Sequence, residues 1–311
     1  MQDTEIVLTH GPWRLAVSPW GASLRGLSLW SGEGYQDVIT GYVGAKHKVG
    51  GQGDVLIPFP GRVAGGHYEF NGQAYQMKKN DTEGPNAIHG FLRQTAWEVV
   101  SQNPDWVMFR TQFAADAHEG YPFALTVRVT YHLDDNGLAC AFDIINTGDT
   151  PAPVSAGFHP YFTAGTTLID PDTLTLPFES YLEYANLLPT GKVLPVADSP
   201  YDFRTGGPVG ETVFNTCFLA PTRDDDGLSR IRLSAPTSDG NTGRTVAVWL
   251  DRTFDYVVLY SGDPLPEDHR RHALAIEPMT CGSDAFNHHA WGLAVLAPGA
   301  ALEGTWGVSV E

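Results

Sequence analysis

The chain has 311 residues, of which 42% are hydrophobic, and a formal net charge of −17. This length allows two domains or one large all-β domain, and the apolar content is ample for a sizeable core. The excess of acidic residues argues against nucleic acid or an anionic membrane as a partner, because phosphate groups would be repelled.

Period-two alternation of apolar and polar residues recurs along the chain and predicts β-strands. In chain order, the segments 67–77, 97–113 and 125–145 each combine two such runs around a turn signal, and we expect three hairpins. In the first of these, Asn71-Gly72 suits a type I′ turn. Further strands are predicted toward the C-terminus, over 244–250, 256–262 and 302–311.

The fold class follows from this pattern. No long stretch repeats its apolar residues every 3.6 positions, and the 34 glycines and 22 prolines are scattered rather than collected in one linker. We therefore predict an all-β protein, a large antiparallel β-sandwich that forms a single domain over residues 1–311. A concave sheet face lined by alternating side chains would suit a sugar.

The cysteines and the N-terminus indicate a cytoplasmic protein. Cys140, Cys217 and Cys281 are far apart and form no CxxC pair, which predicts neither a disulfide framework nor a zinc site. The first ten residues, MQDTEIVLTH, lack the basic, apolar and small-residue progression of a signal peptide. No apolar run approaches the ~20 residues of a membrane-spanning helix.

Four short stretches carry side chains suited to acid–base chemistry. His159 in GFHPYF and Glu277 in LAIEPMTCGSDAFN, at the end of a predicted strand, each precede a proline that restricts the backbone and aims the side chain. Aromatic walls would raise the pKa of Glu277 and make it a useful proton acceptor. PFPGRV and NAIHGFLR contribute a further polar set: Arg62, Asn86, His89 and Arg93.

Each stretch also has a purely structural interpretation. Alone, His159 fits a core histidine, Arg62 a loop brace and Glu277 a turn cap. Other polar or glycine-rich segments lack the spacing of a metal or phosphate site. We interpret three of them as a flexible turn, a solvated turn and a loop: GGQGD (50–54), RDDDG (223–227) and His288-His289.

Together, and in this order, the four stretches closely resemble the aldose 1-epimerase (galactose mutarotase) family. Its pattern has an Arg in P-x-P-x-R, then N-x-x-H-G, HPYF and a carboxylate before proline, which stand here as PFPGRV, NAIHG, HPYF and IEPMTCGSDAFN. The EPMTC…DAFN form and the short HGFLR are most similar to a bacterial branch related to sulfosugar mutarotases. The resemblance covers nearly the whole chain, including YDFR (201–204).

The resemblance implies a β-sandwich of the galactose mutarotase type that interconverts the α and β anomers of a sugar. By this analogy Glu277 is the general base on the anomeric hydroxyl, His159 the general acid on the ring oxygen, and His89 assists. Such transfers need no cofactor or metal, and each contributes about 10²–10⁴-fold. An ionised Glu277 should keep the pKa of His159 from falling. Four residues are expected to bind sugar: Arg62, Asn86, Arg93 and Asn215.

One position departs from the family pattern. Where the family has Asp in a D-x-x-F segment, this chain has Asn215 in FNTCFLA, with Phe218 at the aromatic position. Asn keeps one acceptor oxygen and two donors but lacks the charge. The substitution would ease binding of an anionic sugar, with Arg93 or Lys48 as candidate contacts, or mark a paralogue of low activity.

Two other functions are compatible with the sequence. A non-catalytic sugar-binding or regulatory protein on the same scaffold would not need both an acid and a base. A glycoside hydrolase or lyase usually needs two carboxylates, and Asp284 is the only acid close in sequence to Glu277. The expected partner is a small neutral or anionic aldohexose, and the chain is a monomer or a homodimer.

Overall fold

The computed structural model describes residues 5–44, 47–237 and 242–311. The prediction that residues 1–10 are not a signal peptide therefore falls partly outside the described residues. No α-helix occurs in these three ranges, and short 3₁₀ turns include η2 (Ala64–Gly66) and η3 (Leu92–Gln94). The strands are β1 Ile6–His10, β2 Trp13–Ser18, β3 Ser23–Trp30, β4 Tyr35–Thr40, β5 Arg62–Val63, β6 His67–Phe70, β7 Gln73–Gln76, β8 Ala87–Ile88, β9 Glu98–Gln102, β10 Trp106–Phe113, β11 Leu125–Asp134, β12 Gly137–Asn146, β13 Ala152–Val154, β14 Tyr161–Phe162, β15 Thr173–Thr175, β16 Phe178–Ala185, β17 Leu188–Pro195, β18 Gly207–Pro208, β19 Asn215–Pro221, β20 Ser229–Pro236, β21 Thr242–Leu250, β22 Tyr256–Tyr260, β23 Leu274–Met279, β24 Ala294–Leu296 and β25 Ala301–Val310.

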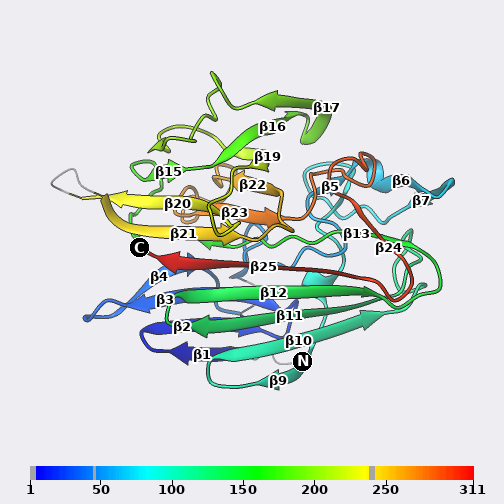
Figure 1. The fold of residues 1–311 in the computed structure, drawn as a ribbon, viewed down its shortest axis with the longest axis horizontal. Coiled ribbons are helices and arrows are strands. Elements are labelled where there is room, and N and C mark those ends of the chain that lie inside the picture. Colours follow the sequence, from blue (N-terminus) through cyan, green and yellow to red (C-terminus); the bar gives the residue numbers. More distant parts are fainter. Residues whose placement is uncertain (1–4, 45–46, 238–241) are drawn as a thin grey trace.

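The strands of the described residues form two large antiparallel sheets. One has the order β1-β2-β3-β4-β14-β23-β22-β19-β16-β17, and the other has the order β18-β15-β20-β21-β25-β12-β11-β10-β9. Figure 1 shows the middle of the second sheet, from β21 through β25 and β12 to β10, as successive neighbours. The predicted all-β, antiparallel sandwich is confirmed.

The three predicted hairpins are present. β6 pairs with β7, β9 with β10 and β11 with β12, all antiparallel. Asn71 and Gly72 both adopt positive φ, 52° and 75°, as a type I′ turn requires. Along β11 every second residue is fully buried, from Leu125 to Leu133, because successive side chains of a strand point to opposite faces.

Phe158 of the GFHPYF segment packs in an aromatic cluster against strands of the second sheet. The ring of Phe158 lies 5.5 Å from Trp306 of β25, 5.9 Å from Phe142 of β12 and 6.4 Å from Phe254. Adjacent residues of an extended chain point to opposite sides. Anchoring Phe158 in the core therefore turns the next side chain, His159, to the other face.

Glu277 lies within a strand rather than at its end. β23 continues through Pro278 to Met279, and Glu277 stands opposite Val258 of β22. Pro278 has no N–H to donate, but its carbonyl accepts a hydrogen bond from Phe158 N at 3.1 Å. The carboxyl is consequently held by a strand on each side, next to the segment that carries the imidazole.

The core position of Phe158 predicts the size of its contribution to stability. Phe158→Ala should lower the free energy of unfolding by about 3–5 kcal/mol, because it leaves a cavity between the sheets. Chemical denaturation followed by tryptophan fluorescence measures this loss. Val43→Ala, at a residue that is 82% exposed, is the control and should stay within about 0.5 kcal/mol. Equal stability of the two variants would contradict the role of Phe158.

Candidate active site

A cavity of about 410 Å³ lies where β22, β23 and the loops before β6 and β9 meet. Its size falls in the range of small-molecule sites, ~300–1,000 Å³. Six of the seven sequence-predicted site residues line it: Arg62, His89, Arg93, His159, Asn215 and Glu277. They come from segments more than 200 residues apart, and the seventh, Asn86, is not on the wall.

The floor of the cavity holds a carboxyl–imidazole pair. His159 Nε2 and Glu277 Oε1 lie 3.4 Å apart, and the two side chains are only 6% and 3% exposed. The backbone of His159 is fixed by two hydrogen bonds, from its N–H to the Asp54 carbonyl (3.0 Å) and from the Gly53 N–H to its own carbonyl (2.9 Å). The contact is therefore set by main-chain pairing and not by a mobile loop.

Two buried polar atoms of this pair have no partner. His159 Nδ1 and Glu277 Oε2 make no hydrogen bond within the described part of the chain. Buried polar atoms in native proteins are nearly always paired, and an unpaired one calls for an explanation. Both atoms belong to side chains that line the cavity.

Burial controls the protonation of the pair. It raises the pKa of Glu277 well above its usual value, against a smaller opposing effect of Arg62. Burial, together with the smaller effects of the Lys48 and Arg93 charges, lowers the pKa of His159 to about 3. The expectation that Glu277 keeps the pKa of His159 up is therefore wrong. Burial therefore favours the neutral form of both side chains.

His89 forms a second wall beside this pair. Its ring lies 5.6 Å from that of His159, edge to face, and its Nδ1 accepts a hydrogen bond from the Gly61 N–H at 3.3 Å. Burial lowers the pKa of His89 well below its usual value, with smaller effects of nearby positive charges. A neutral imidazole that accepts at Nδ1 carries its proton on Nε2. His89 is therefore a hydrogen-bond donor.

The backbone at His89 is strained. Its φ is 61° and that of the following Gly90 is 64°, so two successive residues are left-handed. A Cβ at position 90 would lie 2.1 Å from the Ile57 carbonyl oxygen, which only glycine avoids. A non-glycine residue in this region costs energy and is found preferentially at functional sites.

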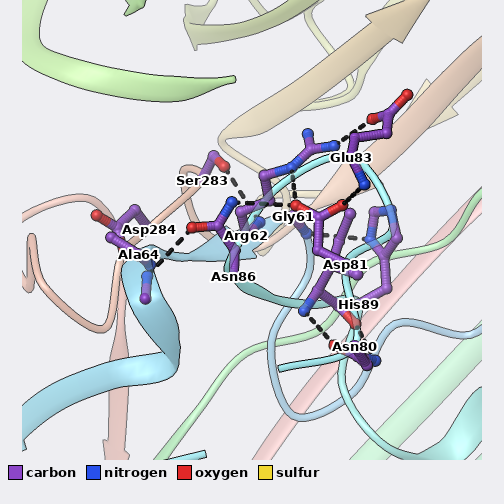
Figure 2. Close-up of polar contacts among 12 residues, drawn as sticks. Gly61, Arg62, Ala64, Asn80, Asp81, Glu83, Asn86, His89, Ser283 and Asp284 are labelled. Carbon is purple, nitrogen blue, oxygen red and sulfur yellow. Dashed lines mark hydrogen bonds and ion pairs between the residues drawn. The ribbon is translucent and has the colours of Figure 1, made fainter. Parts of the chain in front are cut away.

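Arg62 is held at the rim by two acidic residues (Figure 2). Its Nε donates to Asp81 at 2.8 Å and its Nη2 donates to Glu83 at 2.5 Å. Asn86 holds this arrangement in turn, since its Nδ2 donates to Asp81 at 3.0 Å while its Oδ1 accepts from Gly65 N at 3.1 Å. The predicted sugar contact of Asn86 does not fit, because this amide is buried and both of its ends are occupied.

Several residues on the wall were missed by the sequence reasoning. Asp81 and Glu83 lie in a loop without periodicity, and no local signal distinguishes them from solvated acids. Gly51, in the segment interpreted as a flexible turn, lies against the imidazole, since a Cβ there would be 3.0 Å from His159 Cδ2. Tyr161, which belongs to the GFHPYF motif itself, stacks on His159 with ring centroids 5.2 Å apart.

The remaining polar segments stay away from this cavity. His288 stacks on Trp291, with ring centroids 4.1 Å apart, and Arg230 pairs with two acids of the 223–227 turn. Among the described residues no group of three His, Cys, Asp or Glu could hold a metal ion. Of the candidate contacts for an anionic group, Arg93 lines the cavity and Lys48 does not, and both cations pair with Asp54.

A carboxyl–imidazole pair buried in a cavity of an antiparallel β-sandwich is an arrangement suited to proton transfer. A sequence model of the family "Aldose 1-epimerase" matches residues 4–309. The chain therefore belongs to the aldose 1-epimerase family, and it is an isomerase. The family predicted from the four stretches is confirmed.

Three relatives illustrate the range of similarity. "Uncharacterized protein YihR" of Escherichia coli K12 is 32% identical over 239 residues, which cover 76% of this chain and 71% of that protein. The human galactose mutarotase is 30% identical over 202 residues, 61% of this chain and 57% of the human protein. The crystal structure of a GalM/aldose epimerase homologue from C. elegans superimposes with a TM-score of 0.85 at 22% identity, over 99% of this chain and 98% of that chain.

The secondary structure was also compared with the requirements of a membrane-spanning helix. Within residues 5–44, 47–237 and 242–311 there is no helix with the length and apolarity needed to cross a bilayer.

The buried carboxyl predicts a pH-dependent cost in stability. An unfolded Glu277 ionises above about pH 4.5, whereas the folded carboxyl stays protonated, so its contribution to stability falls as the pH rises from 4.5 toward the raised folded pKa. Glu277→Gln removes this loss. We expect the variant to gain stability over the wild type, and to gain more near pH 8 than near pH 5.

Urea denaturation at the two pH values measures this difference. Glu211→Gln, at an exposed glutamate, serves as the matched control and should show no comparable gain. An effect of Glu277→Gln that is the same at both pH values would show that the carboxyl is not protonated by burial.

Proposed function

We propose that the protein is an aldose 1-epimerase that interconverts the α and β anomers of a hexose by opening and reclosing the sugar ring. The observation that carries this proposal is the Glu277–His159 contact on the floor of the cavity. Ring opening removes a proton from the C1 hydroxyl and delivers one to the ring oxygen. A carboxyl and an imidazole side by side can serve both transfers.

The pair needs only one proton throughout the cycle. With sugar bound, Glu277 as carboxylate accepts the proton of the C1 hydroxyl while protonated His159 donates to the ring oxygen. The C1–O5 bond breaks, the C1–O1 bond becomes the aldehyde carbonyl, and the pair is left as a neutral carboxyl and a neutral imidazole. This neutral pair is also the state that burial favours. Rotation about C1–C2 and reversal of the transfers give the other anomer.

Sugar binding stabilises the charged form of the pair, in which Glu277 is a carboxylate and His159 is protonated. This form arises when one proton moves from Glu277 to His159 across the 3.4 Å contact. The pair keeps the same number of protons, so the transfer needs no exchange with solvent. Sugar hydroxyls that donate to the unpaired Glu277 Oε2 stabilise the carboxylate. His89 presents Nε2–H to a ring or hydroxyl oxygen, and Arg62 and Arg93 donate to further hydroxyls.

The hydrophobic core and the cysteines bear on the number of domains and on the cellular compartment. We propose one domain, since a single hydrophobic core cluster includes residues from Leu8 to Val308. Cys140, Cys217 and Cys281 are all buried and free, which supports a reducing cytoplasm.

Removing either member of the pair should abolish most of the catalysis. We expect Glu277→Gln and His159→Asn each to lower the rate of anomer exchange by about 10²–10⁴-fold, because each removes one of the two proton transfers. Exchange NMR on equilibrated glucose and galactose measures the rate. His288→Asn, at a histidine outside the cavity, is the control and should leave it unchanged.

The same experiment separates the alternatives. Wild-type protein that binds hexoses without accelerating exchange would be a sugar-binding protein instead. Release of reducing ends from glycosides would indicate a hydrolase.

We further propose that the enzyme accepts anionic as well as neutral hexoses. Asn215 begins β19, is exposed to the cavity, and stands opposite Tyr260 in the sheet. An aspartate there would repel an anionic substituent, whereas the amide does not. The guanidinium of Arg93 lines the same cavity and, although it also faces Asp54, can donate hydrogen bonds to an anionic substituent.

Restoring a charge at this position should shift the preference among sugars. We expect Asn215→Asp to lower kcat/KM for glucose 6-phosphate relative to galactose by about tenfold, which corresponds to 1.4 kcal/mol. Exchange NMR on both sugars gives the ratio. Asn215→Ser, which adds no charge, is the matched control. A ratio that is equal in the two variants would rule out electrostatic selection at this residue.

A further inference from the structure

Asp284 and its neighbour Ser283 hold the backbone at Arg62. The Asp284 N–H donates to the Arg62 carbonyl at 2.9 Å, and the Asp284 Oδ1 accepts from the Ala64 N–H at 3.0 Å. The Ser283 Oγ accepts from the Arg62 N–H at 3.4 Å. Three backbone groups around Arg62 are therefore bound to two adjacent residues.

The Asp284 carboxylate is itself held in one direction. The residue is 5% exposed, and Asn287 Nδ2 donates to its Oδ1 at 2.8 Å. The same Asn287 amide donates to the His67 carbonyl at 3.0 Å, which fixes the amide in turn. Rotation of the carboxylate would leave buried donors unpaired, and this is costly. The contact from Asp284 to Ala64 is therefore well defined.

The backbone at Asp284 is left-handed. Its φ is 59°, a conformation that is costly for a residue other than glycine and that Asp and Asn tolerate best. Residues persist in such conformations where surrounding contacts hold them, and they cluster at functional sites. The contacts of Asp284 include those to Arg62 and Ala64. The strain therefore points to a role of Asp284 beyond packing.

Asp284 also connects Arg62 to the strand that carries Glu277. It follows β23 after a short segment whose residues are all buried. The N–H groups of Thr280 and Gly282 in this segment donate to carbonyls of other parts of the chain, at 2.9 and 2.8 Å. The Arg62 backbone consequently has a fixed position relative to Glu277.

The guanidinium of Arg62 is held separately, at the far end of its side chain. It donates to Asp81 and Glu83. In Figure 2, Asp284 lies to the left of Arg62 and Asp81 to its right. A long, flexible side chain keeps one direction only when its backbone and its head group are both held. Asp284 supplies the backbone anchor.

We propose that Asp284 is a positioning residue for Arg62, setting the place of the sugar-binding guanidinium relative to the Glu277 carboxyl. Asp284 does not line the catalytic cavity, so it acts through Arg62 and does not touch the substrate. This inference rests on the proposed epimerase function, in which Arg62 donates to sugar hydroxyls. It gives the DAFN part of IEPMTCGSDAFN a role that acid–base chemistry at Glu277 leaves unexplained.

The first test removes the carboxylate without straining the backbone. Asp284→Gly keeps the left-handed conformation accessible but leaves the Ala64 N–H without its acceptor. We expect kcat/KM for glucose, measured by exchange NMR, to fall about tenfold, chiefly through a higher KM, because a misplaced Arg62 weakens sugar binding. Asp284→Asn retains an acceptor oxygen and tolerates the same φ, and it should stay within about threefold of the wild type.

Asp251→Ala is the matched control. The Asp251 carboxylate likewise accepts from backbone N–H groups, those of Thr253 (2.8 Å) and Thr305 (2.6 Å), but it lies outside the cavity. The variant should lose stability in urea without a change in KM. A loss of stability alone would then not account for the effect of Asp284→Gly.

A double-mutant cycle with Arg62 gives an independent arm. If Asp284 acts through Arg62, adding Asp284→Gly to Arg62→Ala should change kcat/KM by less than about twofold. Asn287→Ala removes the other donor to the carboxylate and should raise KM severalfold. It takes the place of Asp284→Gly in the cycle if that variant does not fold.

The inference is overturned if Asp284→Gly, or Asn287→Ala in its place, leaves KM unchanged. It is also overturned if Asp284→Asn loses as much activity as Asp284→Gly, or if the loss is the same with and without Arg62. Each of these outcomes requires an active wild type and leaves the epimerase function standing. A wild type that accelerates exchange of no hexose would refute that function, and this inference with it.

Discussion

The buried contact between Glu277 and His159 is the constraint on which the rest of the site depends. Taking a carboxyl and an imidazole out of water disfavours the charged form of both, so the pair is stable only if its surroundings hold it in place. The β-sandwich holds the pair in place in two ways. Phe158 is packed in the core, and the main chain of His159 is hydrogen-bonded to Gly53 and Asp54. Core packing and main-chain pairing thus fix the imidazole beside the carboxyl.

The positively charged side chains around the cavity are paired with carboxylates. Arg62 is held by Asp81 and Glu83, and Asp54 faces both Lys48 and Arg93. Each cation therefore has a carboxylate partner supplied by the protein. The guanidinium groups are fixed in direction, and the cavity carries little net charge. Neutral hydroxyls can then be bound by oriented donors without a large electrostatic cost.

The sequence predicted those features that depend on local pattern. Period-two alternation and turn residues such as Asn71-Gly72 act over a few positions, so the hairpins and the fold class were accessible. The motifs also pointed to residues that share one cavity. The protonation of His159 was not accessible, because it depends on burial by distant segments. Nor was the position of Asn86, whose partner Asp81 lies in a loop without periodic pattern.

Arg62, Lys48 and Arg93 modify the proton affinities that burial sets for Glu277 and His159. Arg62 lowers the pKa of Glu277, while Lys48 and Arg93 lower that of His159. The first effect eases ionisation of a carboxyl that burial would otherwise keep protonated. The second makes protonated His159 a stronger acid toward the ring oxygen. Both effects thus oppose tight binding of the proton to either group. Anomer exchange requires this balance, because every transfer made on ring opening must be reversed on closure.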